Sequence, residues 1–123
     1  VIVLVETDWT SVSANFSNLE LERRLTNFFR DQMRPNGLAG RQLLALTQQG
    51  NFSNVVAKVM SIVIRDFNET PFNEWLTTEA LKNKVATQNE METWCSELSQ
   101  KSAQKRFLFH VGTVLVSATK ENR

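Results

Sequence analysis

The chain has 123 residues, which suits one domain with a single buried core. Its composition, 41% hydrophobic and 22% charged, excludes an intrinsically disordered chain. The net charge of +1 gives no global field that would indicate binding to nucleic acid or to an anionic membrane. No apolar run approaches the roughly 20 residues of a transmembrane helix. The sequence therefore predicts a soluble protein without membrane contact.

Cysteine usage predicts the compartment. Cys95 is the only cysteine, so no intrachain disulfide can form, and small secreted domains usually depend on such bonds. We therefore expect an intracellular protein, either cytoplasmic or nuclear. The alternative is secretion with N-glycosylation at the sequons that begin at Asn15, Asn51 and Asn68. Helix-capping roles explain these three segments more economically.

The first 48 residues are predicted to contain three helices. Residues 1–5 have the β-branched content of a strand, but the apolar residues of segment 1–16 recur at helical spacings of three and four, which favours a helix. Ser17-Asn18-Leu19-Glu20 has the form of a capping box, which predicts a helix from Asn18 to about Met33. Arg34-Pro35-Asn36-Gly37 indicates a turn, and a short helix is expected from Leu38 to Gln48.

The rest of the chain is also predicted to be helical. Residues 55–64 are apolar on nearly every side, which predicts a central helix around Val59, although their β-branched side chains would also suit a buried strand. Thr70-Pro71 is a helix start signal, and Thr87-Gln88-Asn89-Glu90 is a second capping box, for a helix that ends near Lys101. For residues 107–118 the length of the apolar run favours a helix over a strand.

Together these segments predict an all-α fold, a compact bundle of about six helices, with stacked helical-repeat-like pairs as the alternative arrangement. We expect one helical domain over residues 1–118 and a frayed tail over residues 119–123.

The sequence offers little catalytic chemistry. One His and one Cys, with no zinc or calcium-loop pattern among the carboxylates, predict no metal site, and the absence of a Gly-rich phosphate loop predicts no cofactor. His110 could serve as a general base and Cys95 as a nucleophile in a small hydrolase or transferase. Both residues lie in apolar segments, where a structural role is much more common. We therefore predict a protein that is not an enzyme.

The predicted function is a non-enzymatic protein-protein interaction or scaffold domain. Its candidate binding residues are the basic cluster Lys101, Lys105 and Arg106, which would meet an acidic surface on another protein. Trp75 and Trp94 are added because tryptophan often anchors interfaces, with core packing as the alternative role. The cluster could instead serve the end of the preceding helix. The oligomeric state is left open.

One segment resembles a known family. Lys105-Arg106-Phe107-Leu108-Phe109-His110-Val111-Gly112 is similar to a helix of HEAT-type translation scaffolds of the MIF4G kind, with a basic start and an apolar body. The resemblance covers under a tenth of the chain. It implies a scaffold of stacked helical pairs associated with RNA, for which basic residues would have to converge on one surface, namely Arg34, Arg41, Lys82, Lys84, Lys101, Lys105 and Arg106.

Overall fold

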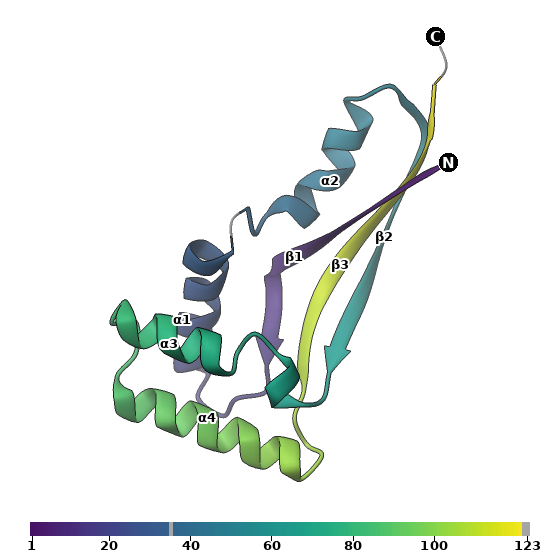
Figure 1. The fold of residues 1–123 in the computed structure, drawn as a ribbon. Coiled ribbons are helices and arrows are strands. Elements are labelled where there is room, and N and C mark those ends of the chain that lie inside the picture. The colour runs from purple at the N-terminus through teal and green to yellow at the C-terminus, as the bar shows by residue number, and fades with distance from the viewer. Residues whose placement is uncertain (35, 122–123) are drawn as a thin grey trace.

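The computed structural model describes residues 1–34 and 36–121, and it shows a mixed α/β fold (Figure 1). Three antiparallel strands form one sheet in the order β1-β3-β2. The strands are β1 (Ile2–Ala14), β2 (Phe52–Ile64) and β3 (Phe109–Lys120). The helices are α1 (Leu19–Phe28), α2 (Ala39–Gln48), α3 (Glu74–Lys82) and α4 (Gln88–Ala103), with a π-helical segment η1 (Phe29–Met33) and a 3-10 segment η2 (Phe67–Glu69).

The prediction of an all-α bundle, and with it that of helical-repeat-like pairs, is wrong. The segments predicted as helices over residues 1–16, 55–64 and 107–118 contain the three strands of the sheet. All three segments are rich in β-branched residues, which lose rotamer freedom in a helix but fit the pleated surface of a sheet. Length favoured a helix for residues 107–118, because a strand of 12 residues is longer than the usual five or six.

The helical predictions outside the sheet are closer to the structure. The capping box at Thr87 and Glu90 is confirmed at the start of α4. At α1 the cap is Asn18 instead of Ser17, because the Asn18 side chain accepts hydrogen bonds from the backbone of Glu20 and Leu21. Thr70-Pro71 precedes its helix by a turn, and α3 begins at Glu74.

The predicted tail is partly structured. Thr119 and Lys120 belong to β3, where they pair with Ser53 and Phe52 of β2. Residues 122–123 of that tail, and Pro35 of the predicted turn, lie outside the described residues.

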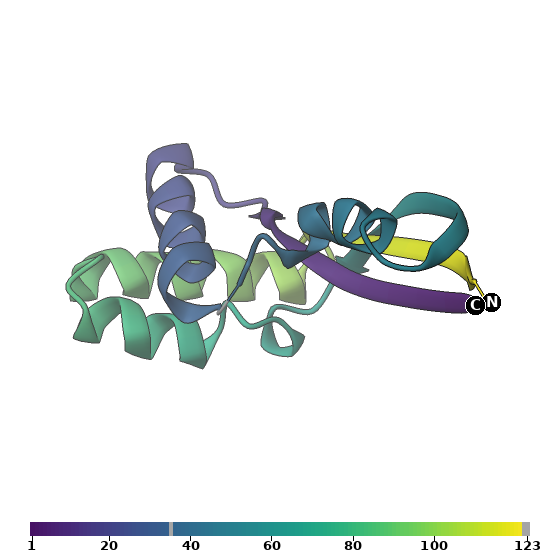
Figure 2. The same ribbon diagram turned by 90° about the horizontal axis from the view of Figure 1, so that it is seen from above.

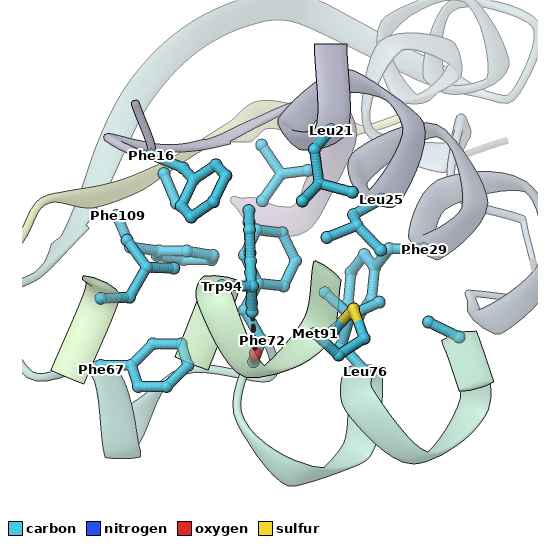
Figure 3. Close-up of a cluster of buried hydrophobic side chains, with 14 of the residues drawn as sticks. Phe16, Leu21, Leu25, Phe29, Phe67, Phe72, Leu76, Met91, Trp94 and Phe109 are labelled. Carbon is cyan, nitrogen blue, oxygen red and sulfur yellow. Dashed lines mark hydrogen bonds between the residues drawn. The ribbon is translucent and has the colours of Figure 1, made fainter. Parts of the chain in front are cut away.

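The main core lies where α1, α3 and α4 cover one end of the sheet (Figure 2). Trp94 of α4 is fully buried there, and its indole Nε1 donates a hydrogen bond to the Phe72 carbonyl oxygen at 3.1 Å. Figure 3 shows Phe16, Phe72 and Phe109 around this tryptophan. The Phe72 ring lies edge-on to Phe109 of β3, with centroids 5.2 Å apart, so the same residue joins the helices to the sheet.

A second, smaller core lies under α2. Side chains alternate between the two faces of a strand, and paired residues of neighbouring strands share a face. On β3 the residues facing the main core are the odd-numbered Phe109 and Val111. The even-numbered Val116 and Ala118 point to the other face and are buried outside that core. We infer that α2 and the other helices cover opposite faces of the sheet. Gly40 allows α2 to approach closely, because a Cβ there would lie 2.7 Å from the Asp8 nitrogen.

We predict that Trp94→Phe lowers the free energy of unfolding by about 2 kcal/mol, because it leaves the Phe72 carbonyl unpaired and a cavity beside it. The matched control is Trp75→Phe on α3, where the side chain is 45% exposed, and its effect should stay below about 1 kcal/mol. Urea unfolding of both variants checks this. Equal losses would contradict the assigned role of Trp94.

Candidate protein interface on the free edge of the sheet

Strand β2 forms one margin of the sheet and is apolar on both of its faces. The exposed fractions along this strand are 51% at Val56, 72% at Val59, 58% at Met60, 43% at Ile62 and 53% at Val63. We call these five residues the β2 patch. In Figure 1 no helix lies along the outer side of β2. A sheet normally buries such side chains, so an exposed cluster of them is a candidate interaction surface.

The pairing register divides the β2 patch between the two faces of the sheet. Met60 pairs with Thr113, and Val56 pairs with Ser117, so both share the face of Val5 and Leu115. That face is bare at its α2 end, where Val3 and Val5 of β1 are also more than half exposed. Val59 and Val63 point to the opposite face, beyond the part that α2 covers. Exposed apolar surface therefore wraps around the β2 edge.

The backbone of β2 is also open along its outer side. Residues 56–64 pair continuously with β3, and none of the hydrogen bonds described for them goes to any other element. An edge strand with unpaired N–H and C=O groups is a template for a further strand. Lys58 is the only charged residue of β2. The edge therefore combines free backbone groups with an apolar, almost uncharged surface.

The opposite edge, β1, is protected. Glu6 and Asp8 place two charges on this strand, and the pairing with β3 is irregular between Asp8 and Ser13. Within that irregular stretch the Trp9 N–H donates to the Gly37 carbonyl at 3.1 Å. Charges, bulges and covering segments are the usual means by which proteins block edge pairing. Only β2 lacks them, apart from Lys58 and an irregularity at its beginning.

The predicted basic cluster lies at and beyond the C-terminal end of α4. The Lys101 ammonium donates to the Asn15 carbonyl and lies 3.2 Å from Glu97 Oε2, so it ties α4 to the end of β1. Lys105 and Arg106 are exposed, and their backbone carbonyls accept hydrogen bonds from Arg65 and from Asn15. Asn15 thus contacts both the Lys101 ammonium and the Arg106 carbonyl. The binding role of the basic cluster stays a prediction.

The two predicted tryptophans lie in different surroundings. Trp94 is fully buried in the main core, so it has no surface to offer a partner in this fold. Trp75 is 45% exposed, and the Arg34 guanidinium lies 6.0 Å from its ring and 4.4 Å from the ring of Trp9. The arginine thus lies against both indoles, an arrangement that stabilises the packing of α3 beside β1.

His110 and Cys95 are not brought into contact. His110 lies in the sheet between Ser13 and Val63, whereas the Cys95 sulfur lies 3.2 Å from the Thr77 hydroxyl oxygen, between α4 and α3. Within residues 1–34 and 36–121 there is no cluster of three or more His, Cys, Asp or Glu side chains that could hold a metal ion. In the same residues no helix has both the length and the apolar character needed to span a bilayer.

Comparison with known proteins adds one partial match. No family model matches the chain. A segment of 65 residues is 32% identical to an uncharacterized 37.1 kDa protein in transposon TN4556 of Streptomyces fradiae. The match covers 53% of this chain and 19% of that protein, so the chain corresponds to only a small part of its relative. The name of that relative states neither an activity nor a partner.

Sequence reasoning did not find the β2 patch, because it placed Val59 in a buried helix. The β-branched side chains of residues 55–64 are the sequence feature that indicates a strand there. The structure exposes Val59 more than any other residue of the patch.

We predict that Val59→Asp changes the free energy of unfolding by no more than about 1 kcal/mol, because the new carboxylate stays in water. The matched substitution Val111→Asp, at a β3 position that is 3% exposed, should cost several times more or prevent folding. Thermal unfolding of dilute protein measures both. A large loss in Val59→Asp would show that the edge is buried in the monomer.

The Glu97 carboxylate gives a pH-dependent prediction. Burial alone would raise its pKa, but hydrogen bonds from the Ser17 hydroxyl and backbone N–H, and from Lys101, outweigh burial and lower the pKa. A lowered folded-state pKa adds stability that is complete above the ordinary pKa of glutamate and is lost as pH falls through the folded value. Glu97→Gln should therefore lower the thermal midpoint at pH 7, and the difference from wild type should narrow in acid.

The control for this measurement is Glu92→Gln, an exposed position on the same helix, which should leave the midpoint at pH 7 nearly unchanged. A Glu97→Gln deficit that is the same at pH 7 and in acid would assign the loss to packing instead of to the charge.

Proposed function

We propose that this chain is a non-enzymatic protein-interaction domain that binds an extended, nearly uncharged segment of another polypeptide chain along the free edge of β2. The observation that carries the proposal is the coincidence of open backbone groups with the exposed β2 patch. Strand addition of this kind gains affinity from main-chain hydrogen bonds and specificity from the flanking side chains. The α-helical layer then serves as the scaffold that holds the sheet.

The charge pattern supports a partner segment without many charges. Lys58 is the sole charge on β2, and it shares its face with exposed valine and methionine side chains. A charged side chain placed beside this surface would lose solvation without a counter-charge, except opposite Lys58. An extended segment rich in Val, Ile or Met fits both the pleat and the apolar surroundings.

We further assign the domain to an intracellular, reducing compartment. The single cysteine supports this assignment, as does the way in which Asn15 is used. The Asn15 amide nitrogen donates to the Arg106 carbonyl, and its amide oxygen accepts from the Leu108 N–H. A glycan on Asn15 would replace one of the two hydrogens of the nitrogen that makes the first of these bonds. This argues against the use of that sequon.

The test captures partners from an extract of the native source on immobilised wild type, Val59→Asp and Val3→Asp. Val3 is a matched control because it is 58% exposed on the opposite edge strand. A partner bound through β2 should be retained by Val3→Asp and lost by Val59→Asp. Reconstituted with the purified partner, Val59→Asp should raise the dissociation constant about 30-fold or more.

Hydrogen exchange on the reconstituted complex then locates the contact, because strand addition must protect amides within residues 56–64. Equal affinity of wild type and Val59→Asp, or protection confined to the helices, would contradict the proposal.

A further inference from the structure

We infer that the segment which occupies the β2 edge is β2 of a second copy, so that two chains join their sheets into one six-stranded antiparallel sheet about a twofold axis. This inference rests on the proposed function and names its partner. β2 itself has the chemistry required of the partner segment, since it is extended, β-branched and carries a single charge. A twofold interface uses the same surface on both copies, so the surface must complement itself.

The distribution of exposed residues favours edge pairing over the stacking of two sheets. Stacking would cover only the face that carries Val56, Met60 and Ile62. Val59 and Val63 would stay exposed on the opposite face. In an edge-to-edge pair each β2 side chain acquires a neighbour on its own face, so both halves of the patch gain cover.

The register of the pair follows from the regular part of β2. Pairing with β3 is continuous from Val56 to Ile64, whereas the stretch before it contains an irregularity and a positive φ of 53° at Asn54. A twofold axis that uses the whole regular stretch passes beside Met60, the middle residue. Met60 then faces Met60 of the second copy, and Val56 faces Ile64 of the second copy.

This register also separates the two lysines. Lys58 faces Ile62 of the second copy, so the two Lys58 positions lie four residues apart along the strands, or roughly 13 Å. That separation exceeds a Debye length of about 8 Å at physiological salt. A register centred on Lys58 would instead place the like charges directly opposite each other, which is destabilising.

The available area suits a specific dimer. From their exposed fractions, the five residues of the β2 patch offer on the order of 500 Å² per copy, or about 1,000 Å² for two copies. That total is close to the lower size of specific interfaces. The edge adds backbone hydrogen bonds along a paired length of roughly 27 Å.

The test uses the purified chain alone. Sedimentation equilibrium should show a dimer with a dissociation constant on the order of 10 μM or lower for wild type. Met60→Lys should raise that constant at least 100-fold because it places two ammonium groups opposite each other at the axis. Met60→Glu should do the same. An equimolar mixture of the two variants should restore a dimer, since lysine then faces glutamate.

Val3→Lys is the matched control, because Val3 and Met60 are each 58% exposed, and it should leave the dimer intact. A second measurement fixes the register. In a Cys95→Ser background, Met60→Cys should form an intermolecular disulfide under mild oxidation, because facing Cα atoms of a strand pair lie about 5 Å apart. Val3→Cys in the same background should form far less.

A monomeric wild type at 100 μM would overturn the inference, as would a dimer that Met60→Lys leaves intact or equal cross-linking at Val3. A monomer that still captures another protein in a Val59-dependent way would overturn only the second copy as the occupant. A monomer whose captured partners ignore Val59→Asp would overturn the proposed function as well.

Discussion

The alternation of side chains along a strand is the constraint on which this structure depends. Each strand places every second residue on the opposite face, so a sheet built from apolar segments of 12 and 13 residues has two faces to cover. The helices cover only part of each face. α1, α3 and α4 bury the face of Val111 at one end, and α2 buries the face of Val116 at the other. Along β2, side chains of both faces stay exposed.

The main core makes this partial coverage stable. Phe72 makes two contacts. Its carbonyl oxygen accepts a hydrogen bond from the Trp94 indole, and its ring lies edge-on to Phe109. These contacts fix α3 and α4 to the sheet without involving the outer side of β2. Substitutions at the exposed residues of β2 are therefore separable from folding, because the buried residues of the main core lie on β1, β3, the helices and the turns, and from β2 only Ile64 packs against them. Such independence is what an interaction surface requires.

How far the sequence predicts this molecule depends on the kind of signal. Helix caps depend only on neighbouring residues, so the capping box of Thr87 and Glu90 correctly predicted the start of α4. The Ser17 signal was misassigned by one residue, because Asn18 caps α1 and Ser17 binds Glu97 of a distant helix. Residues 55–64 gave no resolvable period, since they are apolar on both faces. The exposure of Val59 follows from which face α2 covers, and that is a tertiary property that no local pattern contains.

The two edges of the sheet also determine how far self-association can proceed. In the proposed dimer, pairing through β2 occupies the edge that lacks protection against strand addition. A β1 strand then lies at each outer edge of the joined sheet. Those outer edges carry Glu6 and Asp8, and the irregular stretch after Asp8 has its Trp9 N–H bonded to Gly37. Further strand addition there would require the desolvation of two carboxylates and the loss of an existing hydrogen bond. The geometry therefore closes at two copies, whereas an unprotected β1 would have allowed the sheet to extend without limit.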